Sequence, residues 1–334
     1  MNAVFALLSE TAQQKLVKKN QPDFVSPMLA TLTSDYFSKP TWIYERKWDG
    51  FRIIAIKKGD NITLLTRNKK DYTAQYPHIV AALRKQKAEN IILDGEVVAF
   101  KNQLSSFSLL KKEPLINTDT VLVRYCIFDI LYWDGYDLTK LELLDRKQLL
   151  EQAIEFQDPL LHTDYSTGDG LELLKKACAL NWEGIIAKLA TSTYVTKRSP
   201  NWFKFKCHKQ QEFVIIGYTQ SNNTMNIFGA LLLGYYDKNH LYYAGKVGTG
   251  FDDALHATLG GLLQLLEGPM LDVINFENAP GEIVHWIKPK LVAQIKFAEW
   301  TVYGKLRHAS FLGLRDDKDP KSVTKERPIP NNLG

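Results

Sequence analysis

Cysteine is scarce in this chain, and its spacing argues against two classes of structure. Three cysteines occur among 334 residues, Cys126, Cys178 and Cys207. No two of them form the close C-x-x-C pair of a zinc module, and three scattered residues do not make a disulfide framework. We therefore expect neither a disulfide nor a zinc site, and we expect the protein to work in a reducing cytosol.

Long apolar runs are also missing. No run approaches the roughly 18–20 residues that a membrane-spanning helix needs. Residues 1–19 are amphipathic, but they have no basic start and no small-residue cleavage site, so they do not resemble a signal peptide. We interpret residues 1–23 as a short helical extension packed on the body, and we expect a cytoplasmic protein with no membrane partner.

A strong excess of one charge is absent as well. The 42 basic and 37 acidic residues give a net charge of +5, and 45% of the residues are hydrophobic. These values are ordinary for a globular protein, and the length allows two domains. The mildly basic balance permits a polyanionic partner but does not require one.

The order of strand-like and helix-like segments predicts an α+β fold. Strands are expected at residues 42–47, 51–57, 61–66, 91–100, 121–132 and 184–189, and helices at 76–86, 141–156 and 170–179. These segments lack the regular alternation of a parallel sheet, so we expect largely antiparallel sheets. Turn residues at 58–61 indicate a hairpin, and Asp94-Gly95 is expected to interrupt its strand.

The succession of expected elements changes near residue 207. Short strands are expected beyond it at residues 212–218, 230–236, 241–247, 282–287 and 291–300, with a helix at 252–266. This succession fits a small five-stranded barrel of the oligonucleotide-binding (OB) type. We therefore divide the chain into the extension (1–23), a first domain (24–207), a barrel domain (208–326) and a tail (327–334).

The segment Tyr44–Arg52, Y-E-R-K-W-D-G-F-R, contains the pattern K-x-D-G-x-R. Lys47 can act as a nucleophile only as a neutral amine, and we expect burial and nearby cations to lower its pKa. Asp49 is placed to orient the amine, and Gly50 permits a backbone conformation that a side chain would forbid. Taken alone, the pattern also fits a surface turn.

Three later positions carry groups suited to a nucleotide. Arg67, beyond the hairpin, suits a phosphate or ribose, and its alternative is an ordinary turn. Glu96 follows Asp94-Gly95 at the foot of a strand and suits a ribose hydroxyl or a metal-bound water, although Asp-Gly is also a common turn signal. Phe128 lies in an apolar strand, where it either belongs to the core or stacks on a purine.

Cationic residues gather further along the chain. Glu183 and Lys188 lie at opposite ends of a short strand, and strand alternation places Lys204 and Lys206 on one face. Two like charges on one face need an anion between them, and a triphosphate would serve; the alternative is an amphipathic edge strand. The charged segment Arg307–Lys318 is either a surface loop or a mobile basic clasp for a leaving pyrophosphate.

Taken in this order, the motifs resemble the covalent nucleotidyltransferase superfamily, and specifically the ATP-dependent DNA ligases. The resemblance covers about residues 24–326, and the details are similar to the ligase domain of bacterial ligase D. The stretches that carry it are V-S-P-M-L-A (25–30), F-D-I-L-Y-W-D-G (128–135), E-G-I-I-A-K (183–188), Y-Y-A-G-K-V-G-T-G-F (242–251) and R-H-A-S-F-L-G-L-R-D-D-K (307–318). The resemblance implies an antiparallel adenylation domain followed by an OB barrel.

The resemblance also implies roles for individual residues. Lys47 would become the lysyl-adenylate. The nucleotide contacts would come from Glu45 beside adenine, Arg52 and Arg67 on phosphate and sugar, Glu96 on the ribose, Phe128 on the adenine face, and Lys188, Lys204 and Lys206 on the α-phosphate. Glu183 and Glu96 would hold Mg²⁺ or Mn²⁺, and Arg315, Asp317 and Lys318 would orient pyrophosphate. Lys69 stands where the family usually has glycine.

From the resemblance we expect a monomer that uses ATP and acts on nicked or broken duplex DNA, near the nucleoid and with end-joining proteins as partners. Two alternatives stay open. An RNA ligase or an mRNA-capping guanylyltransferase would use the same lysine chemistry. A non-catalytic strand-binding protein would keep the barrel and an inactive pocket.

Overall fold

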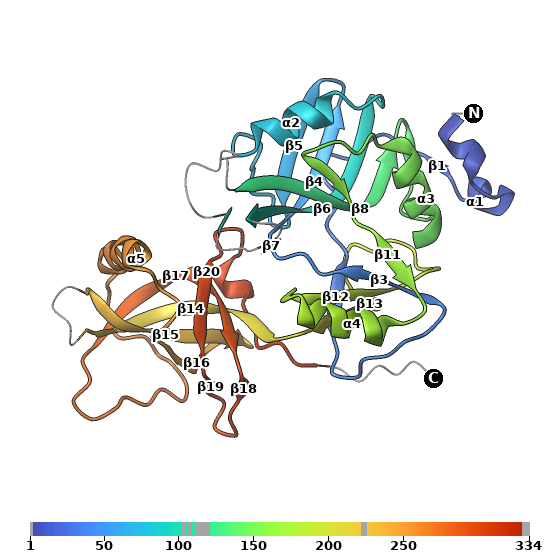
Figure 1. The fold of residues 1–334 in the computed structure, drawn as a ribbon. Coiled ribbons are helices and arrows are strands. Elements are labelled where there is room, and N and C mark those ends of the chain that lie inside the picture. Colours follow the sequence, from blue (N-terminus) through green and yellow to red (C-terminus); the bar gives the residue numbers. More distant parts are fainter. Residues whose placement is uncertain (1–2, 102–103, 106–108, 111–120, 222–225, 329–334) are drawn as a thin grey trace. The chain divides into compact units, whose positions relative to one another are not determined.

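The computed structural model describes residues 3–101, 104–105, 109–110, 121–221 and 226–328 (Figure 1). The chain divides into two compact units: Cys207 and the residues before it, with the end from Pro328, form the first, and His208–Arg327 form the second. Each unit encloses hydrophobic clusters of its own. Among the described residues, no helix is long and apolar enough to cross a membrane.

One sheet of the first unit contains eight strands, with the central order β1-β9-β8-β6-β4-β5. Its strands are β1 (Val17–Lys18), β4 (Phe51–Lys58), β5 (Asn61–Thr66), β6 (Asn90–Lys101), β7 (Leu104–Ser105), β8 (Leu122–Trp133), β9 (Tyr136–Asp137) and β10 (Leu160–His162). Strands β4 and β5 form the predicted antiparallel hairpin. The helices η1 (Ala3–Leu7), α1 (Glu10–Gln14), α2 (Pro77–Arg84) and α3 (Leu143–Ala153) contribute to the core on one side of this sheet.

A second, five-stranded sheet has the order β11-β3-β12-β13-β2. Its strands are β11 (Tyr165–Thr167), β3 (Trp42–Arg46), β12 (Gly184–Leu189), β13 (Arg198–Lys206) and β2 (Leu29–Leu32). One face packs on helix α4 (Gly170–Ala179) through Phe203 and Phe205. The other face meets the first sheet, where Trp202 packs with Phe128 and Ile54. Of the predicted site residues, Phe128 belongs to this cluster between the two sheets.

The second unit is built on a five-stranded sheet of order β16-β15-β14-β17-β20. Its strands are β14 (Lys209–Gln220), β15 (Phe228–Asp237), β16 (His240–Val247), β17 (Val284–Phe297) and β20 (Ser310–Leu314), and a small hairpin joins β18 (Glu299–Trp300) to β19 (Leu306–Arg307). Helix α5 (Asp253–Leu265) packs on this sheet through Leu259 and Leu263, and a short helix η3 (Pro320–Ser322) follows β20. The α+β fold with an OB-type second domain is confirmed.

Two strand predictions are wrong in detail. Strand β6 runs unbroken through Asp94-Gly95, so Glu96 lies inside a strand and not at its foot. Residues 282–287 and 291–300 were expected to form two strands, but Val284–Phe297 is one strand whose register shifts opposite Ile215 and Gly217. At Asp94-Gly95 the turn-like residues are paired with β4 and β8 on both sides, and this pairing outweighs local preference. In β17 the turn-like residues between Trp286 and Leu291 fall in the irregularity itself, so the strand continues across a bulge.

The expectation that no disulfide forms is also wrong. Cys178 in α4 and Cys207 just beyond β13 are joined in a disulfide, with Cα atoms 5.2 Å apart and 29 positions apart in sequence. Helix α4 packs on the sheet that contains β13, and this packing brings the two sulfur atoms together. Cys126 is free and buried.

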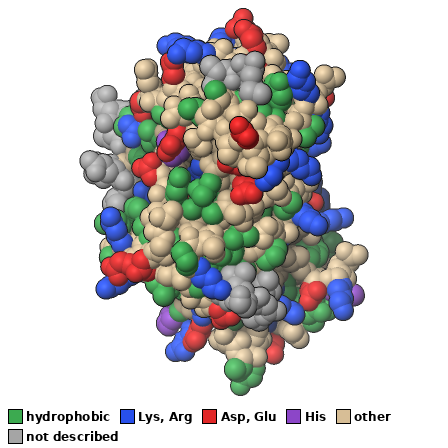
Figure 2. All heavy atoms as spheres, turned by 90° about the vertical axis from the view of Figure 1, so that its right-hand side faces the viewer, with side chains coloured by type: hydrophobic (Ala, Val, Ile, Leu, Met, Phe, Trp, Pro, Cys, Tyr) green, Lys and Arg blue, Asp and Glu red, His purple; other side chains and the backbone are tan. Residues whose placement is uncertain are grey.

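Charged side chains of both signs are interspersed on the face shown in Figure 2, and neither sign dominates it. This mixture agrees with the small net charge of +5. On this face the charges form no broad field of one sign.

Candidate active site

Lys47 and Glu183 meet at the ends of two adjacent strands. Strand β3 ends at Arg46 and strand β12 begins at Gly184, so both residues lie just outside the ladder. The Lys47 backbone N–H donates to the carbonyl oxygen of Gly184 at 3.0 Å, and the Lys47 amine forms an ion pair with the Glu183 carboxylate. The lysine side chain is 20% exposed and the glutamate 6%, so the pair is largely withdrawn from water but can still be reached.

The charge state of Lys47 differs from the one expected. Burial, the largest single influence, lowers its pKa, but the carboxylates of Glu183, Asp49 and Glu96 together outweigh burial, so the pKa of Lys47 is raised above its ordinary value. The expectation of a lowered pKa is therefore wrong for the free protein. Its neighbours are acids rather than cations, and the amine is protonated at neutral pH.

Gly50 is required for space rather than for an unusual backbone angle. A Cβ atom on Gly50 would lie 2.0 Å from the carbonyl oxygen of Val97, and Gly50 is not among the described residues with positive φ. Its N–H donates to Oε1 of Glu96 at 3.2 Å. The turn after Lys47 is thereby pressed against β6, which brings Glu96 into the surroundings of the amine.

Arg52 is held in place by a residue that the sequence did not single out. Its Nε and Nη2 donate to the two carboxylate oxygens of Asp94 at 3.0 and 2.6 Å. Asp94 is fully buried and also accepts from the Tyr194 hydroxyl at 2.6 Å. The guanidinium lies 5.3 Å from the ring centroid of Phe128. Arg52 thus faces the space between the sheets in a fixed orientation, as a group that binds phosphate or sugar requires.

Glu45 is the shared partner of two buried lysines. Its carboxylate oxygens lie 2.5 Å from Nζ of Lys147 and 2.6 Å from Nζ of Lys188, and all three side chains are at most 2% exposed. Burial lowers the pKa of Lys188 to about 8; Lys147 acts in the same direction and Glu45 opposes both. The group carries one net positive charge when both lysines are protonated, which suits an incoming anion.

Phe128 and a second aromatic residue flank Lys188. The amine lies 4.5 Å from the ring centroid of Phe128 and 4.1 Å from that of Trp202. The two rings meet edge to face, with centroids 6.4 Å apart. Phe128 is 9% exposed. In the free protein its ring therefore contacts cations, and a purine would have to take their place.

Lys204 and Lys206 extend the same face of the second sheet. Lys204 is paired across the ladder with Ile186, which is itself paired with Glu45, and Lys206 is paired with Gly184. Residues paired in this way point to the same side of a sheet. Both lysines are half-buried, and their face is the one that carries Glu45 and Lys188.

The turn after β5 holds Arg67 and Lys69. Arg67 is exposed. Lys69 has φ +62°, in the left-handed region that favours glycine. Its N–H donates to the carbonyl oxygen of Thr66 at 2.9 Å, and the Thr66 N–H donates to that of Lys70 at 2.9 Å. The turn geometry typical of glycine is therefore kept here with a lysine.

The predicted pyrophosphate clasp lies in the second unit. Arg315 forms a two-pronged ion pair with Asp317, both distances being 2.9 Å. Lys318 lies 3.1 Å from the carboxylate of Glu212. Glu212, Arg315, Asp317 and Lys318 all belong to the second unit, and these contacts fix the local shape of the segment.

The carboxylates near Lys47 suit a hard cation. Among the described residues, no group of three or more His, Cys, Asp or Glu side chains could hold a metal ion alone. Magnesium, however, is commonly held by one or two carboxylates together with substrate phosphates. Glu183 and Glu96 both lie near the amine, and this donor set fits Mg²⁺ or Mn²⁺ bound along with a nucleotide.

Several residues of the site escaped sequence reasoning. They are Asp94, Lys147, Tyr194 and Trp202, all of them buried. Asp94, Lys147 and Trp202 contact predicted residues, and Tyr194 donates to Asp94. A lone acid or lysine in an apolar segment gives a weak signal for such a role. Trp202 had the strongest sequence signal of the four, because it lies two positions before Lys204 and strand alternation places both side chains on one face.

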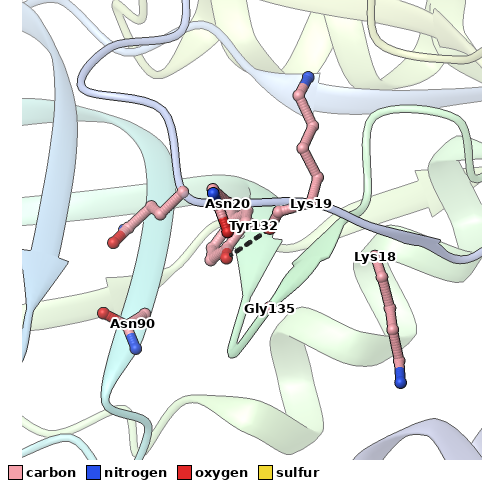
Figure 3. Close-up of a pocket in the computed structure, with 7 residues that line it drawn as sticks. Lys18, Lys19, Asn20, Asn90, Tyr132 and Gly135 are labelled. Carbon is pink, nitrogen blue, oxygen red and sulfur yellow. Dashed lines mark hydrogen bonds between the residues drawn. The ribbon is translucent and has the colours of Figure 1, made fainter.

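A separate open cavity of about 530 Å³ lies on the first unit (Figure 3). It is lined by Lys18, Lys19, Asn20, Gln21, Asn90, Tyr132 and Gly135. The Tyr132 hydroxyl donates to the carbonyl oxygen of Lys19 at 2.8 Å, and the side chains of Lys18 and Lys19 point away from each other (Figure 3). No predicted site residue lines it, so the proposed chemistry does not use it.

Comparison with known proteins decides the family. The model described as ATP dependent DNA ligase domain matches residues 27–206, and the one described as ATP dependent DNA ligase C terminal region matches residues 224–318. The chain belongs to the ATP-dependent DNA ligase family. The family prediction made from the motifs is confirmed.

The curated relatives include end-joining proteins. The chain is 34% identical to the multifunctional non-homologous end joining protein LigD of Pseudomonas aeruginosa over 319 residues, which is 93% of this chain and 38% of that protein. The corresponding LigD of Mycobacterium tuberculosis is 34% identical over 320 residues, or 94% and 41%. The chain thus spans about two fifths of the length of these relatives.

One shorter relative and one solved structure support the same family. The prophage-derived DNA ligase-like protein LigB of Bacillus subtilis is 33% identical over 202 residues, 60% of this chain and 73% of that protein. A mycobacterial DNA ligase D solved with ATP and MES is 32% identical, with a TM-score of 0.65, 90% of this chain and 98% of that one being covered. The predicted likeness to ligase D is confirmed.

Proposed function

We propose that this chain seals breaks in duplex DNA through a lysyl-AMP intermediate on Lys47, with ATP as the nucleotide donor. The observation that carries the proposal is the buried contact of Lys47 with Glu183, beside the cationic face of the second sheet. Membership of the ligase family supports it, and the solved relative contains ATP.

In the first step the Lys47 amine attacks the α-phosphorus of ATP. The amine must first lose a proton, and the Glu183 carboxylate in contact with it is the nearest acceptor. A nitrogen–phosphorus bond forms while the bond from phosphorus to the bridging oxygen breaks, and pyrophosphate leaves. The carboxylates of Glu183, Asp49 and Glu96 raise the pKa of the free amine, so ATP binding has to weaken their influence.

Cations of the chain neutralise the charge that spreads over the phosphoryl oxygens. Lys188, Lys204 and Lys206 share one sheet face, and Arg52 is oriented by Asp94. Such fixed charges are the main source of catalysis in phosphoryl transfer. A divalent cation held by Glu183 and Glu96 would add Lewis-acid polarisation of the phosphate. Phe128 would exchange its cation contacts for the adenine ring.

Two further steps complete sealing. AMP passes from Lys47 to the 5′-phosphate at a break, and the 3′-hydroxyl then attacks that phosphate as AMP departs. We expect most DNA contacts to be made to phosphates, so binding should weaken with salt and show little sequence preference. We further propose a cytoplasmic monomer that acts near the nucleoid, repairs nicked or broken DNA, and has end-joining proteins as partners.

The deciding experiment follows label from α-labelled ATP. The wild-type protein should become labelled, and Lys47→Ala should take up none while still binding nicked DNA. Uptake from GTP would point to a capping enzyme, and preference for nicked RNA would point to an RNA ligase. A wild type that binds DNA but never takes up label would support the strand-binding alternative.

A further inference from the structure

Arg46, next to the proposed nucleophile, has a role that the reaction scheme does not assign. It is the last residue of β3, and alternation directs its side chain to the face opposite Glu45 and Lys47. Its guanidinium carbon lies 4.2 Å from the ring centroid of Trp48 and 4.3 Å from that of Trp182. One cation therefore contacts two indole rings that come from separate segments.

The two tryptophans are the chain neighbours of the reacting pair. Trp48 follows Lys47 directly, and Trp182 precedes Glu183 directly. Both segments lie beyond the β3–β12 ladder. A tie between the two rings therefore also controls the spacing of the lysine amine and the carboxylate.

Other contacts fix the ends of this arrangement. Trp48 donates from Nε1 to the Thr163 hydroxyl at 3.0 Å, and Nη2 of Arg46 donates to the Ser105 hydroxyl at 2.7 Å. Nε of Arg46 is buried, and within the described part of the chain it has no hydrogen-bond partner. Burial lowers the pKa of Arg46 to about 10. The ring faces thus supply much of what stabilises this withdrawn cation, a setting in which cation–π attraction is strong.

We propose that Arg46 is a positioning residue for nucleotidyl transfer, and that by bridging Trp48 and Trp182 it holds the Lys47 amine against the Glu183 carboxylate. The inference rests on the proposed function. Arg46 points away from the face that would bind ATP, so its loss should slow the transfer step and leave ATP binding nearly unchanged. Small displacements of reacting groups can cost about 100-fold in rate.

The test measures single-turnover labelling of the full chain with α-labelled ATP. Arg46→Met keeps the apolar stem and removes the cation. We expect its rate at saturating ATP to fall roughly 10–100-fold, while the ATP concentration for half-maximal rate stays near the wild-type value. Arg46→Lys, which keeps a charge over the rings, should recover part of the loss. Lys18→Met is the control, because Lys18 also lies near an aromatic ring, that of Tyr136 at 5.9 Å, and it should label at the wild-type rate.

A second pair of variants tests the ring side of the contact. Trp182→Phe keeps an aromatic face and should label nearly as fast as wild type, whereas Trp182→Leu should lose rate as Arg46→Met does. Thermal unfolding is recorded for each variant, and if Arg46→Met does not fold, the Trp182 pair decides.

Rates like wild type in both Arg46→Met and Trp182→Leu would overturn the inference, as would a change confined to ATP affinity or an equal loss in Trp182→Phe and Trp182→Leu. A wild type that never takes up label would instead contradict the proposed function itself.

Discussion

At the scale of single residues, the Lys47 side chain of the free protein is an ammonium ion. Acids surround it and raise its pKa. For a lysine, a raised folded-state pKa means that the ion pair with Glu183 stabilises the protein below the ordinary lysine pKa. That stabilisation is lost only as the pH rises through the raised value. As the proposed nucleophile, Lys47 would therefore stay unreactive until a nucleotide and cation alter the charges around it.

Glu183→Gln tests this protection. Removing the carboxylate removes the leading influence that raises the pKa of Lys47. The midpoint of the alkaline rise in self-adenylation rate should therefore move to lower pH, even though the maximal rate falls. Labelling rates recorded from pH 6 to pH 10 give this midpoint. Glu172→Gln, at an exposed ion pair on α4, should leave the midpoint where it is in the wild type. An unshifted Glu183→Gln profile would contradict the assignment.

Lys69 offers a second residue-scale prediction. A non-glycine residue in the left-handed region costs about 1–2 kcal/mol, part of which glycine returns through its freer unfolded chain. Lys69→Gly should therefore raise the free energy of unfolding by about 1 kcal/mol, measured by urea denaturation. Gly59, at φ +56° with open space around it, is the matched position, and Gly59→Ala should change stability in the opposite direction. A destabilised Lys69→Gly would sink the idea.

At the scale of elements, the local residue pattern predicted most strands, but it does not show which strands pair with one another. β5, α4 and β12 have the predicted bounds, because each is short and bounded by turn residues. β6 passes through Asp94-Gly95 because β4 and β8 pair on both its sides. The sequence located Arg52, but its orientation by Asp94 and Tyr194 depends on strands that meet only in the folded sheet.

The same limit explains the missed disulfide. Cys178 and Cys207 are 29 positions apart, and only the packing of α4 on the second sheet brings them together. The loop that they close contains Glu183, Lys188, Lys204 and Lys206. The cross-link therefore constrains the part of the chain that carries most of the proposed phosphate contacts.

Breaking the cross-link should measurably weaken the first unit. Loop-closure entropy for a loop of this length is worth about 3–4 kcal/mol. Cys178→Ser should therefore lower the free energy of unfolding by roughly that amount, and dithiothreitol should have the same effect on the wild type. The reductant should have no further effect on Cys178→Ser. Wild-type protein whose unfolding ignores the reductant would show that the bond is not formed.

At the scale of the whole molecule, the proposed chemistry needs both units, although each has its own core. The predicted pyrophosphate clasp, with Arg315 and Lys318, lies entirely in the second unit. Pyrophosphate leaves only in the first step of the proposed reaction. A variant of the clasp should therefore impair the first step of the reaction and spare the later steps.

Lys318→Ala makes that separation testable. Self-adenylation should slow by about 10–100-fold, because one cation that would receive the leaving group is gone. Sealing of a nick that already carries 5′-adenylate should proceed at nearly the wild-type rate. Both are measured on gels with labelled substrate. Lys321→Ala, an exposed lysine in η3, should affect neither step. Equal losses in both steps would remove Lys318 from its assigned role.

The position of the cross-link also limits how the two units can be reoriented. Strand β13 ends at Lys206 and strand β14 begins at Lys209, and Cys207 between them is tied to α4. In the oxidised protein the disulfide holds Cys207 against α4, so the first-unit side of this connection cannot lengthen. A rotation of one unit relative to the other would then have to occur mainly through the backbone torsion angles around His208. Reduction of the disulfide would allow more torsion angles to take part.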